Sequence, residues 1–190
     1  QVHVYDRYDR IGGLLMYGIP GFKLEKSIVE RRAKLLRDSG VHFHLNVDVG
    51  GETRFEDIWA EHDAILVATG VYRARDIATP GSGLDGIVPA LEYLTASNQK
   101  SLGDQVEAFD NGTLNAENKD IVVIGGGDTA MDCVRTAIRQ KAKSVSCLYR
   151  RDRANMPGSQ REVQNAEEEG VVFKWLSAPQ AFLGDVREEA

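Results

Sequence analysis

The segment DIVVIGGGDTAMDCVRTAIRQ, residues 120–140, constrains the fold of this chain more than any other. It opens with the apolar run Ile121 to Ile124, which is typical of a strand buried on both faces. Glycines follow, and then Met131, Val134 and Ile138 recur at helical spacing, which indicates a helix with one buried face. The segment therefore predicts a strand, a glycine turn and a helix in an α/β fold.

The turn matches the pattern G-x-G-x-x-A, with Gly125, Gly127 and Ala130 at the fixed positions. The first glycine permits a tight turn, the second lets the backbone approach a pyrophosphate, and the small third residue lets helix and strand pack closely. Free N–H groups at the helix start favour phosphate. We expect a dinucleotide site formed by Gly125, Gly126, Gly127, Asp128, Thr129 and Ala130. Asp128 has a second interpretation, as an acid that stabilises the helix N-terminus.

Residues 145–153, VSCLYRRDR, alternate as the next parallel strand and end in arginines. Sites specific for NAD carry an acid in this region, which binds the ribose 2′-OH. Here Arg150, Arg151 and Arg153 stand in its place, and an arginine fork suits a 2′-phosphate. The sequence predicts NADP(H) rather than NAD(H). The alternative is a glycine-rich turn of another βαβ protein beside solvated arginines.

Composition excludes several classes of function. A net charge of −6 argues against a general nucleic-acid binder, and no apolar run approaches the length of a membrane span. Cys133 and Cys147 form no CxxC pair, so we expect buried free thiols, which suit a reducing cytoplasm. Two such cysteines hold neither an iron–sulfur cluster nor a redox disulfide within this chain.

The first residues indicate a second nucleotide domain. Residues 2–6 alternate as a strand that ends in Asp6, and a loop with Gly12 and Gly13 follows. This order resembles the second strand of an FAD-binding Rossmann domain, where the carboxylate accepts hydrogen bonds from the adenosine ribose. The glycine fingerprint of such a domain would lie about 20 residues upstream, so we interpret the chain as an internal fragment of a longer protein. A solvated strand end is the alternative for Asp6.

The rest of the chain continues the α/β pattern. We expect a helix over residues 24–39 with Ile28, Leu35 and Leu36 in the core, and a strand over 41–47. His42 and His44 share one face of that strand. They could bind a metal, but no third ligand is evident, which favours a solvated or partner-facing pair.

Further elements complete the expected domains. The expected elements are a short helix or turn over 56–61, a buried strand over 64–70 that ends in ATG, a helix over 89–95, a polar connector over 97–119, a charged helix over 159–169 and a strand over 171–175. The predicted organisation is a partial FAD-binding domain over 1–80, a linker with a short helix over 81–118 and a C-terminally truncated NADPH-binding Rossmann domain over 119–190.

The segments IGGLLMYGIPGFKL, LVATG, VVIGGGDTAMDCVRTAIRQ and CLYRRDRANMPGSQREVQNAEEEGV resemble the small (β) subunits of bacterial NADPH-dependent glutamate synthases. The wider resemblance is to FAD- and NADPH-binding proteins of the pyridine nucleotide-disulfide oxidoreductase type, including ferredoxin oxidoreductase subunits. It implies hydride transfer from NADPH to FAD, and then electron transfer through 4Fe-4S clusters to the large (α) subunit, which forms glutamate from 2-oxoglutarate and glutamine. The implied location is the cytoplasm, and this chain would ligate none of the clusters.

The resemblance also implies roles for single residues. Asp6 would bind the FAD ribose, Lys23 would reach the FAD phosphates or the flavin edge, and Val49 would lie beside the adenine. The remaining implied FAD contacts are the backbone of Gly12, Gly13 and Leu14 along the flavin, and Thr69 and Gly70 around the cofactor. Lys23 could equally be an ordinary surface lysine.

Hydride transfer between two cofactors needs no side-chain acid or base, so we expect no catalytic residue, and we assign no metal ligand. Two other functions stay open. One is a ferredoxin oxidoreductase-type subunit with a different electron acceptor. The other is an incomplete fragment that is inactive alone and serves only as a nucleotide-binding or assembly module.

Overall fold

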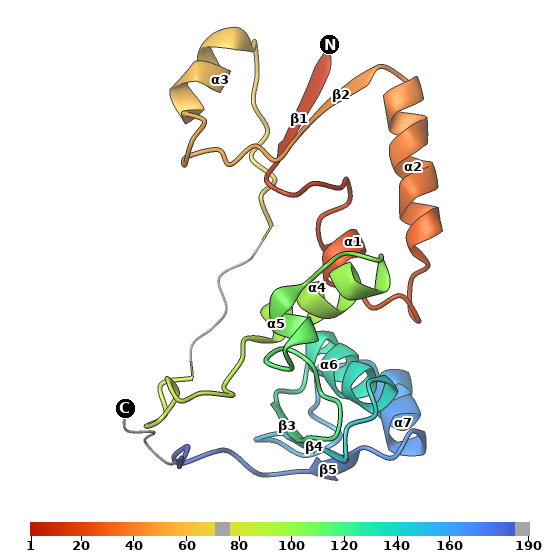
Figure 1. Cartoon of the computed structure of the whole chain (residues 1–190), viewed down its shortest axis with the longest axis vertical. Coiled ribbons are helices and arrows are strands. Elements are labelled where there is room, and N and C mark those ends of the chain that lie inside the picture. The colour runs from red at the N-terminus through yellow and green to blue at the C-terminus, as the bar shows by residue number, and fades with distance from the viewer. Residues whose placement is uncertain (71–76, 185–190) are drawn as a thin grey trace. The chain divides into compact units, whose positions relative to one another are not determined.

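Two parallel sheets organise the residues described by the computed structural model, which are 1–70 and 77–184. The sheets belong to two compact units, within Gln1–Tyr72 and Arg73–Ala190 (Figure 1). Helices connect or follow the strands in both units, which confirms the predicted α/β class. The domains expected over 1–80 and 119–190 each extend into residues outside the described ones.

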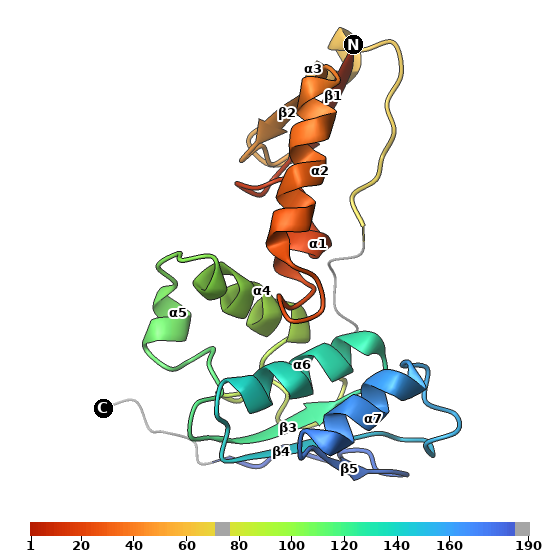
Figure 2. The same cartoon turned by 90° about the vertical axis from the view of Figure 1, so that its right-hand side faces the viewer.

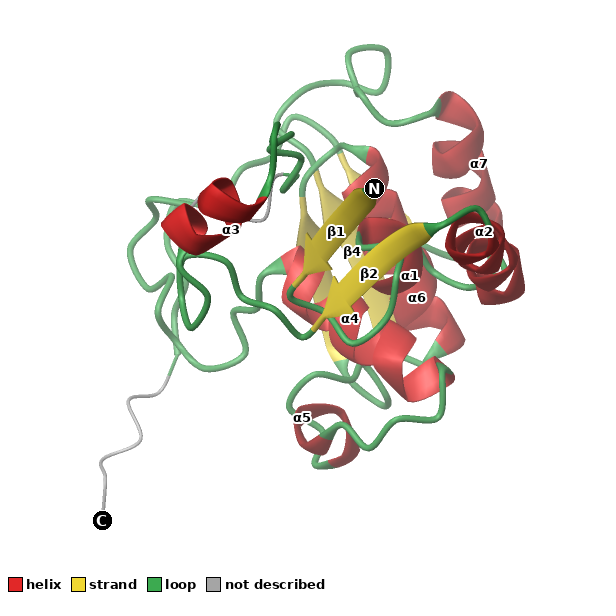
Figure 3. Cartoon of the chain, turned by 90° about the horizontal axis from the view of Figure 1, so that it is seen from above, coloured by secondary structure: helices red, strands yellow, loops and turns green. Residues whose placement is uncertain are grey.

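The first unit is built on a parallel strand pair. β1 (Val2–Asp6) pairs with β2 (Val41–Leu45), and Figure 3 shows the two strands side by side and pointing the same way. The helices of this unit are α1 (Leu14–Tyr17), α2 (Lys26–Asp38) and α3 (Phe55–Glu61). The predicted helix over 24–39, strand over 41–47 and short helix over 56–61 are therefore confirmed, with ends that differ by one or two residues.

The predicted core face of α2 is wrong. Ile28, Leu35 and Leu36 are 44%, 47% and 48% exposed, whereas the buried residues of this helix are Val29 and Ala33. Val29 and Ala33 are four residues apart and so lie on one face. A two-stranded sheet covers only a narrow stripe of a helix, and these two smaller side chains occupy that stripe.

The predicted buried strand over residues 64–70 is also wrong. No strand is present there, and Leu66 and Val67 are 88% and 69% exposed. A strand needs a hydrogen-bonded neighbour, and no strand of the described residues pairs with this segment. Its apolar sequence alone does not supply one.

Histidines gather on one face of the β1–β2 pair. The register places His3 opposite His42. The ring centroid of His3 lies 4.9 Å from the ring centroid of His42, and 5.2 Å from each of the ring centroids of His44 and His62. Nδ1 of His3 is 2.9 Å from Nε2 of His44. The sequence indicated only His42 and His44; the parallel register and α3 bring in the other two. Within the described residues, no group of three or more potential ligands has a geometry that could hold a metal ion.

This histidine cluster predicts a pH dependence. Desolvation, followed by the charges of the neighbouring imidazoles, lowers the pKa of His3 below its ordinary value of 6.5. Near that pH the unfolded chain binds more protons than the folded chain. The free energy of unfolding should therefore keep its full value above about pH 6.5 and should fall as the pH drops below it. NMR titration of the imidazole Cε1–H signals should show His3 titrating at lower pH than a random-coil histidine. A variant His44→Gln should move the His3 titration upward, and an unchanged His3 would contradict the coupling.

The second unit contains a three-stranded parallel sheet in the order β3 (Asp120–Ile124), β4 (Ser144–Leu148) and β5 (Val172–Lys174). Helices α6 (Asp128–Arg139) and α7 (Gln160–Glu168) lie together on one face of this sheet (Figure 2). Much of the core of this unit comes from those helices and from β4, including Met131, Val134, Ala137, Val145, Cys147 and Val163. These elements confirm the predicted strand, turn, helix and strand order.

One expectation for this sheet is wrong. β3 was predicted to be buried on both faces, but Val122 is 57% exposed, as is Val172 of β5. Both helices lie on the same face of the sheet (Figure 2). Val122 and Val172 are in register with Ser146, which alternates with the buried Val145 and Cys147, so they point to the opposite face. The apolar run therefore belongs to a strand that helices cover on one face only.

The connector before β3 is more ordered than its polar sequence suggests. α4 (Ala90–Ser101) continues beyond the expected end at Thr95, and α5 (Glu107–Asp110) follows. α4 packs on α6, and it buries Leu94, Ala96 and Asn98. Tertiary contact with α6 stabilises a helix that local propensity under-predicts.

Both cysteines are free and buried, as predicted. Burial raises the pKa of the Cys133 thiol to about 12 and that of Cys147 to about 11, which keeps both protonated near neutral pH. Among the described residues, no helix combines the length and the apolar character that a membrane crossing requires.

Candidate dinucleotide-binding site

The glycine turn between β3 and α6 is held against the next strand. The N–H of Gly125 donates to the carbonyl of Leu148 at the end of β4, 3.1 Å away. Gly125 has φ +155°, and a Cβ built on it would lie 3.3 Å from Cβ of Ala130. A larger side chain at position 130 would crowd this approach. The small third residue of the pattern therefore has the packing role that the sequence predicted.

The next two glycines have different reasons for lacking a side chain. A Cβ on Gly126 would lie 2.3 Å from the ring of Tyr149, so this glycine makes room for an aromatic side chain of the protein. A Cβ on Gly127 would meet nothing within 4 Å. Gly127 is also the N-cap of α6, with φ −91° and ψ 175°, which other residues adopt. The space beside Gly127 is open for a ligand.

This difference predicts opposite outcomes for two matched variants. Gly126→Ala should destabilise the second unit by about 1–3 kcal/mol, because Tyr149 must move. Gly127→Ala should leave stability within about 0.5 kcal/mol of the wild type, because its methyl group enters open space. Urea denaturation measures both. Equal destabilisation by the two variants would contradict the contact between Gly126 and Tyr149.

The predicted arginines follow β4 directly, at the same edge of the sheet as the turn. Arg150 and Arg151 are exposed, and no hydrogen bond or ion pair of their side chains is found within the described residues. The backbone beside them is fixed, because Leu176 donates to the carbonyl of Arg151 at 3.1 Å and Ser177 to that of Tyr149 at 3.0 Å. Both guanidinium groups can thus meet an anion from an ordered backbone.

Arg153 has a partner within the protein. Its Nη1 and Nη2 each lie 2.9 Å from a carboxylate oxygen of Glu167 in α7. A phosphate would have to share this guanidinium or displace Glu167. The sequence did not indicate this pair, because residues 14 positions apart across a turn show no periodic signal.

The start of α6 provides the remaining predicted residues. Asp128 and Thr129 are exposed, and Oδ1 of Asp128 accepts the N–H of Ser159 at 3.0 Å. Gly158 donates to the carbonyl of Gly126 at 2.9 Å, so the second half of the 150–159 loop reaches back to the glycine turn. Tyr149 and Gly158 are parts of this site that the sequence did not indicate, because each acts through contacts with residues far away in the chain.

The predicted FAD residues lie in the first unit. Oδ1 of Asp6 accepts the N–H of Tyr8 at 3.0 Å, at the end of β1. Gly12 and Gly13 have φ +127° and +50°, and a Cβ on Gly12 would lie 2.7 Å from Val29. These glycines permit the turn that leads into α1. Leu14 at the start of α1 is 40% exposed.

The other predicted FAD residues are not gathered into one site by the first unit's described contacts. Lys23 is exposed, and Val49 is 38% exposed and forms an isolated parallel bridge with Thr53. Thr69 and Gly70 lie in the exposed segment that forms no strand. Their FAD roles stay predictions from the resemblance.

Tyr17 is a buried polar residue that the sequence did not indicate. It is fully buried in α1, its hydroxyl donates to Asp9, and Arg10 donates to it at 2.9 Å. Burial, followed by the hydrogen bond to Asp9, raises the pKa of Tyr17 to about 12. The phenol therefore stays protonated and holds the 9–17 segment together.

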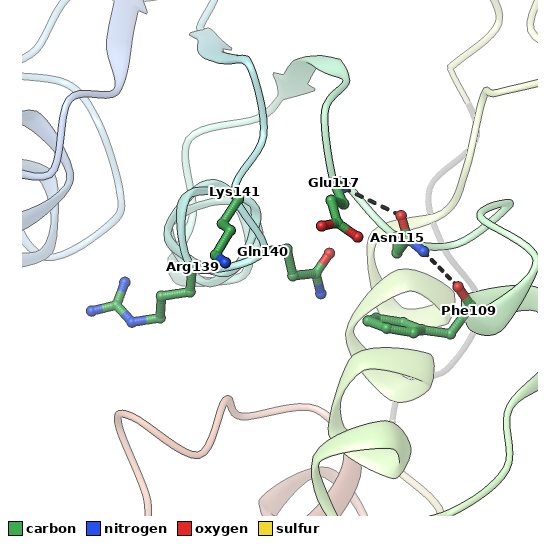
Figure 4. Close-up of a pocket in the computed structure, with 6 residues that line it drawn as sticks. All are labelled: Phe109, Asn115, Glu117, Arg139, Gln140 and Lys141. Atoms are coloured by element: carbon green, nitrogen blue, oxygen red, sulfur yellow. Dashed lines mark hydrogen bonds between the residues drawn. The ribbon is translucent and has the colours of Figure 1, made fainter.

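A separate cavity of about 200 Å³ lies at the opposite end of α6 (Figure 4). It is lined by Phe109, Asn115, Glu117, Arg139, Gln140 and Lys141. The amide of Gln140 accepts from Tyr93 and Ala116 and donates to Ser97, each at 2.9 Å. These bonds hold α4 and the connector on the end of α6, so we assign the hollow a packing role.

A family model for pyridine nucleotide-disulphide oxidoreductases matches residues 46–188. The chain belongs to this family. The matched residues include the glycine turn, α6 and the arginines after β4. Family membership and the parallel sheets together confirm the predicted fold class.

Individual relatives agree with the resemblance drawn from the sequence. The chain is 69% identical to the glutamate synthase (NADPH) small chain of Azospirillum brasilense, over 97% of this chain and 38% of that protein. It is 67% identical to the putative glutamate synthase (NADPH) small chain of Cereibacter sphaeroides, over 99% of this chain and 45% of that protein. The chain thus spans less than half the length of these relatives.

Among solved structures, Mycobacterium tuberculosis FprA in complex with NADPH matches with a TM-score of 0.71 at 20% identity. The match covers 89% of this chain and 41% of that one. At this identity the likeness shows a shared fold.

Proposed function

We propose that the glycine turn and the arginines after β4 bind NADPH, and that the chain is part of a glutamate synthase small subunit in which NADPH reduces FAD. The observation that carries this proposal is the pairing of two features at one sheet edge. Open space lies beside Gly127, and the exposed Arg150 and Arg151 follow the adjacent strand. The relatives named as NADPH-dependent small chains support it.

The coenzyme preference follows from charge. A 2′-phosphate accepts charge-assisted hydrogen bonds from a guanidinium fork, and such bonds are roughly twice as strong as neutral ones. Arg150 and Arg151 offer this fork. Unlike Arg153, which is paired with Glu167, neither is held in an ion pair within the described residues. NADH lacks the 2′-phosphate and so gains little from either residue. We therefore infer that the site discriminates in favour of NADPH.

FAD would contact the first unit partly through the protein backbone. The positive φ angles of Gly12 and Gly13 open the loop after β1, and Asp6 presents a carboxylate at the end of that strand. When bound, FAD would supply the hydride-accepting flavin. The residues of this chain would bind and orient the two cofactors, which is the contribution a protein makes to such a reaction. Asp6 would hold the ribose, and Lys23, Val49, Thr69 and Gly70 would complete the contacts.

The later steps extend beyond this chain. We propose that electrons leave the flavin through 4Fe-4S clusters held by other parts of the protein and reach a large subunit in the cytoplasm. Cys133 and Cys147 are buried with raised pKa values, and so are poor cluster ligands. The names of the relatives, as small chains of glutamate synthase, support a large-subunit partner.

Anaerobic reduction of a longer protein that contains this chain tests the proposal. Flavin absorbance at about 450 nm should be present and should bleach much faster with NADPH than with NADH. Gly127→Ala should keep the flavin and slow its reduction by NADPH, because the methyl group occupies the space for the pyrophosphate. A folded, colourless protein would instead support a nucleotide-binding module, and equal rates with both coenzymes would contradict the NADPH preference. Electron transfer to ferredoxin, with none to a large subunit, would support the ferredoxin oxidoreductase alternative.

A further inference from the structure

Asp128 connects two parts of the candidate NADPH site that are far apart in the sequence. It is the first residue of α6, and its Oδ1 accepts the N–H of Ser159 at 3.0 Å. Ser159 is the N-cap of α7 and ends the 150–159 loop that carries the arginines. One carboxylate thus joins the start of α6 to the start of α7.

A second contact reinforces this connection. Gly158 donates its N–H to the carbonyl of Gly126 at 2.9 Å, and a Cβ built on Gly158 would lie only 3.0 Å from that oxygen. Gly158 and the neighbouring Met156 are both buried. The end of the loop therefore packs directly on the backbone of the glycine turn.

The start of α7 in turn fixes Arg153. Nε2 of Gln160, the first residue of α7, donates to the carbonyl of Arg153 at 3.1 Å. The guanidinium of Arg153 is paired with Glu167 further along the same helix. The backbone and the side chain of Arg153 are thus both tied to α7, and Asp128 ties α7 to the glycine turn.

The geometry points to Asp128 as a positioning residue for coenzyme specificity, which holds the arginine-bearing loop against the glycine turn and does not itself bind the coenzyme. This inference rests on the proposed binding of NADPH. A carboxylate aimed at a pyrophosphate would repel it, whereas one that accepts the Ser159 N–H is directed at the loop. A loop ordered before binding need not be ordered by the ligand, which improves affinity for the group that the loop contacts. That group is the 2′-phosphate.

Two substitutions separate this role from a direct charge effect. Asp128→Asn removes the charge and keeps a side-chain oxygen that can accept the Ser159 N–H, whereas Asp128→Ala removes the acceptor. Ser159→Pro removes the N–H donor, together with a hydroxyl that makes no capping hydrogen bond, and the φ of −55° at Ser159 already suits proline. Glu168→Ala is the matched control, since this exposed acid of α7 accepts a hydrogen bond from Gln164 of the same helix, 2.9 Å away, and lies outside the 150–159 loop.

Calorimetric titration of the full-length flavoprotein with NADP⁺ and NAD⁺ tests the inference, with melting temperatures to check folding. Asp128→Ala should raise the Kd for NADP⁺ about tenfold, as expected for the loss of a hydrogen bond to a charged group, and should change the Kd for NAD⁺ less than about twofold. Ser159→Pro should do the same, the double variant should be no worse than either single variant, and Asp128→Asn and Glu168→Ala should resemble the wild type.

Other outcomes would overturn the inference. Equal weakening for NADP⁺ and NAD⁺ in Asp128→Ala would mean that the residue supports the part of the site that both coenzymes share, and an Asp128→Asn variant as weak as Asp128→Ala would mean that the hydrogen bond to Ser159 is not what matters. Tighter binding of both coenzymes in Asp128→Ala and Asp128→Asn would mean that the carboxylate acts through its charge on the shared pyrophosphate. If Asp128→Ala does not fold, Ser159→Pro and Asp128→Asn still decide between the two roles. A wild-type protein with no preference for NADP⁺ would contradict the proposed function itself, which is a separate result.

Discussion

Replacing Arg150 and Arg151 together by alanine is expected to raise the Kd for NADP⁺ by about a hundredfold. A hydrogen bond to a charged group contributes roughly 1.5–3 kcal/mol. The two arginines bind the same phosphate and their contributions are not additive, so the loss of both amounts to about 3 kcal/mol, which is about a hundredfold in Kd. The Kd for NAD⁺ should change by less than about twofold, because NAD⁺ carries no 2′-phosphate. Both arginines are exposed on a backbone held by Leu176 and Ser177, so their removal should leave folding intact.

The control for this double variant is Arg161→Ala, which removes an exposed arginine of α7 with no side-chain bond found in the described structure. It should leave both Kd values unchanged. Replacement of Arg150 and Arg151 by lysine should recover only part of the affinity, because an ammonium group supplies charge without the planar fork. A comparable loss of NAD⁺ and NADP⁺ binding in the alanine variant would contradict the assignment of the arginines to the 2′-phosphate.

The features of the second unit that the sequence predicted are those that depend on neighbours in the chain. The glycine turn, the amphipathic α6 and the position of Arg150 after β4 follow from local pattern, and all are present. The contacts of Gly126 with Tyr149 and of Asp128 with Ser159 were not predicted. Each depends on how a loop returns across the sheet edge, which periodicity does not encode.

The first unit was predicted less well, for a related reason. Periodicity identified α2 as a helix but chose the wrong face, because Ile28, Leu35 and Leu36 are more apolar than the buried Ala33. The choice of face depends on which strands lie next to the helix. The apolar run over 64–70 shows the same limit, since it forms no strand where no described strand pairs with it.

Replacing Arg135 by methionine is expected to destabilise the second unit by about 3 kcal/mol. This arginine of α6 has a side chain only 10% exposed, and it donates to Glu162 at 2.7 Å and to Glu169 at 2.8 and 3.0 Å, both near α7. Removing one partner of a buried ion pair costs about 3–5 kcal/mol, because the remaining charges stay desolvated. The lower end applies, since the two glutamates are 17% and 24% exposed and Arg139 still pairs with Glu169.

The pH dependence of this loss identifies its electrostatic origin. Burial alone would raise the pKa of Glu169, but hydrogen bonds from Arg139 and Arg135 outweigh it and hold the pKa below its ordinary value of 4.5. A depressed carboxyl pKa stabilises the folded state above about pH 4.5, and this stabilisation is lost as the pH falls.

The difference in the free energy of unfolding between wild type and Arg135→Met should therefore be largest at pH 7 and smaller at pH 4. Urea denaturation followed by Trp175 fluorescence, in a Trp59→Phe background, measures this difference. Lys143→Met, which breaks an exposed pair with Asp120, should change stability far less, because solvent screens that pair. If Arg135→Met were no more costly than this control, or if its cost did not vary with pH, packing of the arginine stem rather than its ion pairs would hold α6 and α7 together.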